Sequence, residues 1–501
     1  MMLELDWLKR WNLYSPGKVA IKDGDTGREY SYAKLYEMAN RGAHVLAEQY
    51  QISKGDRVAI LATNELEYVF LFFALQRLGA ILVPVNFRLT PREVEHIIKD
   101  SNPKIVLFQE TFRDVIDSIS SQSFQKALFQ GPGSFTEQMN EASISEVPFV
   151  PVEKDAVMIL YTSGTTGAPK GAIITHQMIF WNSINTGLRL NLSQNDCTVI
   201  FLPFFHTGGW NVLTTPFIHR GAKVVFLKKF EAEPILALSE KEQATILFGV
   251  PTTMEIMSRS PIFADIDLSK IRYAIVGGEP MPLELIKVWH KKGIPIRQGY
   301  GLTEFGPSVF SLNEEDALRK IGSIGFPNFY CDAKIVDNEN NELGADEVGE
   351  LLLRGPVCMA GYWKNEKATR DTIKEGWLHT GDLARRDQEG YYYIVGRKKD
   401  MFISGGENVY PPELEQVIRS HPGVVEVAVV GVPDDKWGEV GKAFVVADNA
   451  AVTMDSLQAH CLKNLAKFKI PKHFVFMKAL PKGDSGKILK RKLLEETSSS
   501  N

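Results

Sequence analysis

The segment YTSGTTGAPKG, residues 161–171, directly follows the apolar run Ala156–Leu160. A short apolar run of this kind predicts a buried strand, which here ends in glycines, hydroxyl side chains and one cation, Lys170. Glycine lets the backbone approach a ligand closely, and successive free N–H groups form a nest for an anion. The segment therefore predicts a strand followed by a loop that cradles a triphosphate.

Two common motifs with related chemistry are missing from the sequence. The P-loop pattern GxxxxGK[ST] is absent, because no Gly-Lys pair in the chain is followed by Ser or Thr. The G-x-S-x-G nucleophile elbow is absent as well. These absences count against a P-loop NTPase and against an α/β-hydrolase.

Length and charge restrict the class of protein. A chain of 501 residues is long enough for about three structural units. Its 57 basic and 61 acidic residues give a net charge of −4, so no general field favours nucleic acid and we expect no nucleic-acid partner. The four cysteines are scattered without a CxxC pair, which indicates free thiols in a reducing compartment.

The sequence predicts no transmembrane segment. The N-terminus has no secretory pattern, and the most apolar stretch, Tyr68–Leu75, is far shorter than the roughly 20 residues that a membrane span needs. We expect a cytoplasmic protein. Weak peripheral contact with a membrane stays open, although no basic amphipathic helix supports it, and monomer and homodimer are both open.

Short apolar runs alternate with helical patterns in the first half of the chain. Helix Pro91–Lys99 is expected, with Thr90 as its N-cap and proline in its first position. Strands are expected at Arg57–Leu61, Ile81–Val85, Lys104–Phe108, Ala222–Leu227, Thr245–Phe248 and Tyr273–Val276. This alternation predicts an α/β fold with a largely parallel sheet covered by helices on both faces.

The pattern changes at about residue 318, where short strands and frequent glycines predict a mostly antiparallel unit. A second helix–strand alternation follows residues 397–400. We therefore expect a large N-terminal domain of helix-flanked β-sheets, residues 1–396, with a β-rich subdomain at about 318–396. A hinge at 397–400 would join it to a smaller, mobile α+β domain at 401–501.

Four further segments carry groups that suit a nucleotide. QGYGLTE (298–304) places small residues, which allow close approach to a flat base, beside the carboxylate Glu304. HTGD (379–382) ends in an acceptor for ribose hydroxyls, and GRKKDMFISGGEN (396–408) adds an arginine and a glycine-rich turn. PKGDSGKILK (481–490) places Lys487 where it could reach a developing phosphate charge.

Together these motifs, in this order, resemble the adenylate-forming superfamily of acyl-CoA synthetases, luciferases and adenylation domains. The resemblance covers nearly the whole chain. FLPFFHTGGW (201–210), SGGENVYPPELE (404–415) and GVPDDKWGE (431–439) are most similar to bacterial medium- and long-chain fatty acyl-CoA synthetases.

The resemblance implies an AMP-forming acid–thiol ligase that uses ATP, Mg²⁺ and coenzyme A. A carboxylic acid, expected to be a medium- or long-chain fatty acid, would form acyl-AMP with release of pyrophosphate. The CoA thiol would then take the acyl group and release AMP.

The resemblance also assigns roles to individual residues. Lys487, His206 and Glu304 would be catalytic, with Glu304 and Thr165 holding Mg²⁺. Contacts with ATP or AMP are implied for Thr162, Ser163, Gly164, Thr165, Thr166, Gly167, Lys170, Gly277, Gly278, Glu279, Gln298, Gly299, Tyr300, Gly301, Thr303, Asp382 and Arg397.

The acyl and CoA sites follow from the same resemblance. The acyl pocket would include Gly209, Trp210 and Gly301, and Trp210 could either gate a fatty-acid tunnel or simply pack in the core. Lys399 occupies the hinge position, and the CoA channel would be lined by Gly405, Gly406 and Glu407.

Three other functions remain as alternatives. The substrate could be an aryl or another carboxylic acid. The chain could be a non-catalytic nucleotide-binding protein, which the combination of Lys487, Glu304, Asp382 and Arg397 argues against. A luciferase-type oxidase is a third possibility, which light emission would reveal.

Overall fold

The computed structural model describes residues 3–120, 124–162, 169–279, 281–449, 451–483 and 488–498. The chain forms two compact units. The first unit comprises Met1–Ala333 and Leu353–Leu378, and the second comprises Lys334–Leu352 and His379–Asn501. Each unit has its own hydrophobic core.

The first unit contains most of the parallel strands. Its strands are β1 (Val19–Asp23), β2 (Glu29–Ser31), β3 (Arg57–Leu61), β4 (Ile81–Pro84), β5 (Ile105–Phe108), β6 (Gln125–Leu128), β7 (Ala156–Thr162), β8 (Lys170–Thr175), β9 (Cys197–Ile200), β10 (Lys223–Phe226), β11 (Ile246–Gly249), β12 (Tyr273–Val276), β13 (Ile296–Tyr300), β14 (Phe310–Ser311), β15 (Ser323–Pro327) and β18 (Ile373–Lys374).

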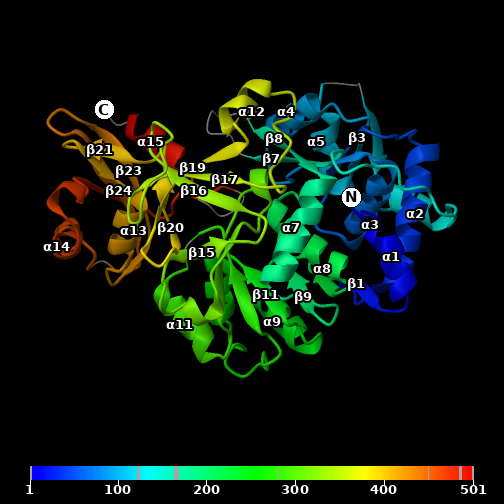
Figure 1. The fold of residues 1–501 in the computed structure, drawn as a ribbon, viewed down its shortest axis with the longest axis horizontal. Helices are drawn as coiled ribbons and strands as arrows, with labels where there is room; N and C mark the ends of the chain where they lie inside the picture. The colour runs from blue at the N-terminus through cyan, green and yellow to red at the C-terminus, as the bar shows by residue number, and fades with distance from the viewer. Residues whose placement is uncertain are drawn as a thin grey trace. The chain divides into compact units, whose positions relative to one another are not determined.

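Helices surround these strands. They are α1 (Trp7–Tyr14), α2 (Tyr32–Glu48), α3 (Leu66–Leu78), α4 (Pro91–Ser101), α5 (Arg113–Asp117), α6 (Phe135–Glu141), α7 (His176–Arg189), α8 (Thr214–Arg220), α9 (Ala232–Lys241), α10 (Pro251–Ser258), α11 (Leu283–Lys291) and α12 (Glu366–Thr372). Figure 1 shows α1, α2 and α3 grouped together in blue. Helix α3 is apolar on nearly all sides because it is buried along its length.

The strands that flank the glycine-rich segment, β7 and β8, belong to a sheet with the strand order β6–β5–β3–β4–β7–β8. The strands β6, β5, β3, β4 and β7 run parallel to one another, and β8 runs antiparallel to β7. The residues of β3, β4 and β5 are almost all buried, because helices cover such a sheet on both faces.

Two further sheets complete the first unit. One has the order β2–β1–β10–β9, and the other begins β11–β12–β13–β14–β15. Strands β9 and β10 share a core with β11, β12 and β13, into which the fully buried Trp289 of α11 packs. Strands β12 and β13 are parallel, so their carboxyl ends lie at the same edge.

The start of α4 shows why its sequence forms a helix there. Thr90 is the N-cap and Pro91 occupies the first turn, where its missing N–H costs nothing. The Thr90 backbone N–H donates to Glu93 Oε2 at 2.8 Å. This is the reciprocal half of a capping box, which adds to the N-cap that the sequence predicts at Thr90.

The second unit is built on antiparallel strands. They are β16 (Asp332–Val336), β17 (Gly349–Arg354), β19 (Trp377–Arg386), β20 (Tyr392–Arg397), β21 (Phe402–Ser404), β22 (Glu407–Val409), β23 (Val424–Asp434), β24 (Gly438–Ala447) and β25 (His473–Phe476), of which β16, β17 and β19 begin or end in the residue ranges of the first unit. Its helices are α13 (Pro411–Arg419), α14 (Met454–Asn464) and α15 (Lys490–Ser498).

Strands β23 and β24 form a long hairpin in a sheet with the order β22–β21–β24–β23, and β25 lies parallel to β24. One face of this sheet packs against α13 and α14 around Leu414, Ile418 and Leu457. The other face packs Phe444 against Leu493 of α15.

The α/β fold class and the expected strands are confirmed, with ends that coincide or differ by one residue. The parallel strands are distributed over several sheets instead of forming one. The predicted hinge at 397–400 lies within the second unit, and the predicted domain boundaries stay predictions. Within the described ranges, no helix combines the length and apolar character that crossing a bilayer requires.

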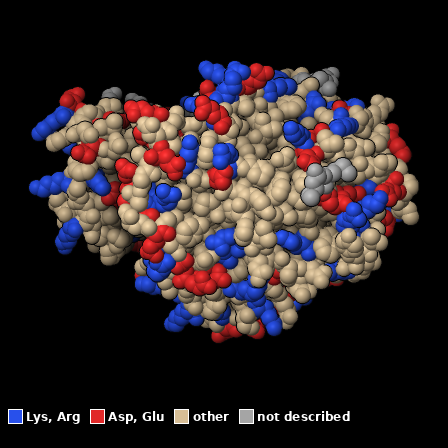
Figure 2. All heavy atoms as spheres, viewed as in Figure 1, with Lys and Arg blue, Asp and Glu red and all other residues tan. Residues whose placement is uncertain are grey.

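Surface charge agrees with the small net charge of −4. Figure 2 shows Lys and Arg interspersed with Asp and Glu over the face in view, without a large area of one sign.

Candidate nucleotide site

The two ends of the glycine-rich loop lie side by side. Thr162 is the last residue of β7, Lys170 is the first of β8, and the two are paired across the strands. A Cβ atom on Gly171 would lie 2.6 Å from Ile159 Cγ2, so this glycine is required for close strand packing. The predicted residues Ser163, Gly164, Thr165, Thr166 and Gly167 lie outside the described residues.

Glu304 lies beside the end of β7, in the short 3-10 helix Thr303–Phe305 that follows β13. Thr162 Oγ1 donates to Glu304 Oε1 at 3.2 Å, and Tyr362 Oη donates to the same oxygen at 3.0 Å. Lys170 Nζ lies 5.3 Å from the centre of the Tyr362 ring. We call Thr162, Lys170, Glu304 and Tyr362 the Glu304 cluster.

The Glu304 cluster fits a magnesium ion that arrives with a triphosphate. Mg²⁺ usually keeps several waters and binds through one or two carboxylates plus substrate phosphates. Within the described residues, no group of three or more His, Cys, Asp or Glu side chains could hold a metal ion, so a dedicated protein cage is not seen there. A single oriented carboxylate beside a lysine matches the first arrangement.

Gln298 holds the turn that follows β12. Its Oε1 accepts a hydrogen bond from Met281 N at 3.0 Å. Its Nε2 donates to Val276 O at 3.2 Å and to Glu279 O at 3.1 Å. The buried amide is therefore used to position the segment that carries the predicted Gly278, whose φ is +86°.

The predicted contacts with the base lie where β12 and β13 end. A Cβ atom on Gly277 would lie 3.6 Å from Gly299 O, so these two glycines are close neighbours. Tyr300 is the last residue of β13, and its ring lies 5.8 Å from that of Phe310. Ligands of α/β sheets bind outside the carboxyl ends of strands, which supports this placement.

Gly209 and Gly301 allow close approach of the backbone. A Cβ atom would lie 2.4 Å from Pro203 O at Gly209 and 1.9 Å from Pro307 O at Gly301. The space beside each glycine is thus filled by main chain. Their predicted role of leaving room for an acyl group stays a prediction.

Trp210 lies in the core, within the π-helical turn Gly208–Val212. Its ring stacks on Phe204 at 4.4 Å and lies 4.8 Å from Phe72, and its Nε1 donates to Phe204 O at 2.7 Å. His206 lies just before this turn, with its ring 4.6 Å from that of Phe205. The described contacts of Trp210 are those of a packed side chain, and gating stays a prediction.

Asp382 and Arg397 face each other in the second unit. They are register partners on β19 and β20, and Arg397 Nε donates to Asp382 Oδ1 at 2.8 Å. Arg397 Nη1 also donates to Thr380 O at 3.2 Å. The Asp382 carboxylate is buried, whereas the Arg397 side chain is half exposed. The two residues predicted to contact the ribose therefore form an ion pair with each other.

The predicted hinge and CoA-channel residues occupy two turns of the second unit. Lys399 is exposed in the turn after β20, where Asp400 N donates to Arg397 O at 3.1 Å. Gly405 and Gly406, with φ of +62° and +88°, form the two-residue turn between β21 and β22. Positive φ at both positions is the type I′ pattern that favours glycine, and Glu407 begins β22.

The predicted catalytic lysine, Lys487, lies outside the described residues. Lys482 and Ile488, which lie before and after it in the chain, form an antiparallel β-bridge. Leu489 N donates to Pro481 O at 2.8 Å.

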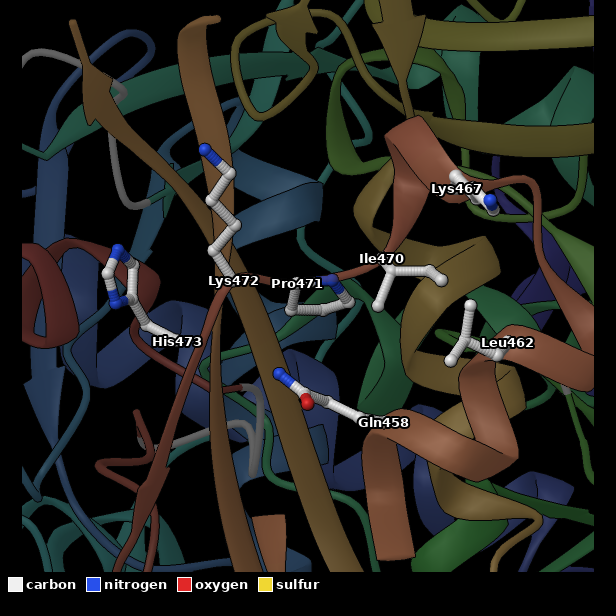
Figure 3. A pocket seen from close by; sticks show the side chains of 7 residues that line it. All are labelled: Gln458, Leu462, Lys467, Ile470, Pro471, Lys472 and His473. Atoms are coloured by element: carbon white, nitrogen blue, oxygen red, sulfur yellow. The ribbon is translucent and has the colours of Figure 1, made fainter. Parts of the chain in front are cut away.

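Two described pockets lie within single units. One, of about 160 Å³, includes Lys170 together with Asp100 and Trp363, and so borders the Glu304 cluster. The other, of about 410 Å³, lies between α14 and the segment before β25 (Figure 3). It is lined by Gln458, Leu462, Lys467, Ile470, Pro471, Lys472 and His473, none of which the sequence predicts as a site residue.

Comparison with known families identifies the class of protein. The family model described as "AMP-binding enzyme" matches residues 8–363, and the model of the AMP-binding enzyme C-terminal domain matches residues 413–487. The chain belongs to the AMP-binding enzyme family. The predicted membership of the adenylate-forming superfamily is thereby confirmed.

Relatives of this AMP-binding enzyme match along almost their whole length. It is 38% identical to long-chain-fatty-acid–CoA ligase FadD13 of Mycobacterium tuberculosis, covering 99% of each chain. It is 36% identical to feruloyl-CoA synthase of Amycolatopsis sp., covering 97% of each. The structure of ATP-bound MatB from Rhodopseudomonas palustris matches with a TM-score of 0.92 and 33% identity, covering 99% of each. This AMP-binding enzyme is an AMP-forming acid–thiol ligase, as the sequence predicts.

No motif in the sequence marks Tyr362 as a site residue. In this AMP-binding enzyme it contacts both Glu304 and Lys170, yet it lies in the stretch CMAGYWKN, residues 358–365. That stretch has no charged pair or glycine-rich run that would predict a binding role. Only its distance from Glu304 in the folded chain reveals it.

Proposed function

We propose that this AMP-binding enzyme activates a medium- or long-chain fatty acid and transfers it to coenzyme A. The carboxylate oxygen attacks the α-phosphorus of ATP and expels pyrophosphate, giving acyl-AMP. The CoA thiol then attacks the acyl carbon, loses its proton and expels AMP. Both steps concentrate negative charge on phosphate oxygens, so fixed cations and N–H groups are expected to provide most of the catalysis.

The Glu304 cluster is the observation that carries the proposal. It brings a lysine, a carboxylate and two hydroxyls together from three segments, at the end of a buried strand. A bound Mg²⁺, held by Glu304 with the predicted help of Thr165, would neutralise charge on the triphosphate. We propose that Lys170 contacts the same phosphates and that Lys487 acts on the α-phosphate.

The fatty acid is the finer part of the proposal. The relative FadD13 is named a long-chain-fatty-acid–CoA ligase, and its likeness covers almost the whole chain. The segment that carries His206 is apolar as well: the His206 ring lies against Phe205, and the neighbouring Phe204 stacks on Trp210. An aliphatic tail would be favoured by such surroundings.

An aryl acid is the second candidate. The relative named feruloyl-CoA synthase is almost as similar, at 36% identity. The Trp210 ring stacks on Phe204 and lies tilted against Phe72, and an aromatic acid would find similar partners there.

We also propose where and with what the enzyme works. CoA would reach the acyl-adenylate past Gly405, Gly406 and Glu407. Asp382 and Arg397 would contact the ribose of the nucleotide. The cytoplasm, where ATP and CoA are available, is the proposed compartment.

A panel of carboxylic acids tests the proposal. Acids from acetate to palmitate, with ferulate and other aryl acids, are assayed by ATP–pyrophosphate exchange and by CoA-dependent AMP release. We expect both activities to be highest with acids of medium or long chain. Higher activity with aryl acids would favour the second candidate, and exchange with none of the acids would contradict the proposed reaction.

A further inference from the structure

We infer that Tyr362 is a positioning residue that fixes two ligand-binding groups at once, Glu304 through its hydroxyl and Lys170 through its ring. The inference rests on the proposed function, because that function gives Glu304 and Lys170 their ligands. It concerns a residue that neither the motifs nor the family match singles out.

The backbone around Tyr362 extends the sheet beyond β8. Ala360 N donates to Ile173 O at 3.1 Å, and Ile173 N donates to Gly361 O at 2.9 Å. Tyr362 itself forms a bridge with Ala172. Ala172 lies two residues after Lys170, the first residue of β8. Its bridge partner Tyr362 is therefore close to Lys170 on the neighbouring chain segment.

The residues after Tyr362 are anchored as well. Trp363 N donates to Gly171 O at 2.7 Å. Trp363 Nε1 and Lys364 Nζ both donate to Asp100 O, at 3.1 and 2.7 Å, at the end of α4. The main chain is thus anchored on both sides of Tyr362, which fixes the position from which the Tyr362 side chain extends.

The hydroxyl of Tyr362 orients the carboxylate. Tyr362 Oη and Thr162 Oγ1 both donate to Glu304 Oε1, at 3.0 and 3.2 Å. Two donors on one oxygen restrain the rotation of the carboxylate, and no described residue donates to Oε2, which can therefore take a ligand. The phenol of a tyrosine keeps its proton at neutral pH, so the hydroxyl of Tyr362 is the donor in this hydrogen bond.

The ring of Tyr362 contacts the lysine. Lys170 Nζ lies 5.3 Å from the ring centre, within the range of a cation–π interaction. Among the described residues no carboxylate lies within ion-pair distance of Lys170. The ring therefore restrains the ammonium group without neutralising it, which leaves its charge for a phosphate.

Two substitutions separate the two contacts. Tyr362→Phe removes the hydroxyl and keeps the ring, whereas Tyr362→Leu removes both. Tyr50→Phe is the matched control, because Tyr50 Oη also donates to one side chain, Gln138 Oε1 at 3.0 Å, far from the cluster in sequence.

Binding is measured with Mn²⁺ as the probe, by electron paramagnetic resonance in the presence of ATP, and with ATP alone by calorimetry. We expect Tyr362→Phe to weaken Mn²⁺ binding about tenfold and to leave metal-free ATP binding unchanged, because outer-shell partners of a metal ligand typically contribute 10–100-fold. Tyr362→Leu should weaken both. In the exchange assay, Tyr362→Phe should raise the Mg²⁺ concentration for half-maximal rate and leave the rate at saturating Mg²⁺ nearly unchanged.

Equal Mn²⁺ binding by Tyr362→Phe and Tyr50→Phe would overturn the inference. Thr162→Val, which removes the other donor to Oε1, gives an independent test if Tyr362→Leu fails to fold. Weakened Mn²⁺ binding without activation of any acid would contradict the proposed function while supporting the positioning role. Activation of acids by the unaltered protein, together with unchanged Mn²⁺ binding in Tyr362→Phe and Tyr362→Leu, would contradict the positioning role while supporting the proposed function.

Discussion

At the scale of single residues, the adjacent Gly208 and Gly209 differ in how much room the fold leaves for a side chain. A Cβ atom on Gly209 would meet the carbonyl oxygen of Pro203 at 2.4 Å, which no side chain tolerates. A Cβ atom on its neighbour Gly208 would meet Leu202 and Phe248 at 3.7 and 3.8 Å, an ordinary contact distance. The sequence shows only a glycine pair, and the fold distinguishes its members.

This difference predicts unequal effects of a methyl group. Gly209→Ala should destabilise the protein by about 1–3 kcal/mol, the usual range for overpacking a filled site. Gly208→Ala should change stability by less than about 1 kcal/mol and serves as the control. Thermal unfolding measures both, and equal midpoints for the two variants would contradict the structural account.

The residues of the Glu304 cluster show how far sequence motifs reach. Thr162, Lys170 and Glu304 could be predicted because they belong to motifs with characteristic composition. Tyr362 could not, because it acts through two contacts with residues 58 and 192 positions away in the chain. A single aromatic side chain in an ordinary stretch carries no pattern that marks such contacts.

At the scale of elements, α7 contains the buried His176 and α8 contains the half-buried His219. Burial lowers the pKa of His176 to about 4, and neither of its ring nitrogens has a hydrogen-bond partner among the described residues. Burial, with a smaller effect of Arg220, lowers the pKa of His219 to about 3. The His219 ring stacks on Trp7 of α1 at 4.0 Å, and its Nδ1 lies 2.8 Å from Ser183 Oγ on α7.

These two helices should make stability depend on pH. An unfolded histidine has a pKa of about 6.5, so the unfolded chain binds protons before the folded one as the pH falls. The contribution is fully present above about pH 6.5 and is lost toward pH 4 and below. The free energy of unfolding should therefore fall by about 1–3 kcal/mol per histidine across this window, as denaturant titration at several pH values would show.

Substitution isolates the contribution of one histidine. His176→Leu should flatten the pH dependence and leave stability at pH 7.5 unchanged or higher, because it removes a buried polar ring without hydrogen bonds. His473→Leu, at an exposed position on β25, is the control and should keep the wild-type slope. An unchanged slope in His176→Leu would show that this residue does not titrate in that window.

At the scale of the whole molecule, the two half-reactions should be separable by mutation. Lys399 is exposed in a turn, and its N–H donates no backbone hydrogen bond within the described residues, so proline there should be tolerated locally. If the turn is the hinge, Lys399→Pro should keep pyrophosphate exchange and lower CoA transfer.

Lys487→Ala provides the opposite case. Loss of one key electrostatic donor should reduce adenylation by at least ~10²-fold and affect thioester formation from supplied acyl-AMP much less. The two variants are compared in exchange and in transfer assays. A parallel loss of both activities in Lys399→Pro would reject the hinge role of this turn.

The sequence by itself determined the class of fold and the chemistry of the nucleotide site. Both depend on local sequence: the alternation of apolar runs with helical segments, and five motifs whose residue types suit phosphate, ribose or metal. These signals depend on neighbours in the chain, so they can be read before the chain is folded.

The tertiary structure alone decided how the parallel strands divide into sheets and which partners each side chain meets. In the folded chain the Gln298 amide binds the turn after β12, and backbone fills the space beside Gly209 and Gly301. The fold also places the Tyr362 hydroxyl within hydrogen-bond distance of Glu304. Such contacts join residues that are distant in the chain, and packing selects them through the shape of the whole core.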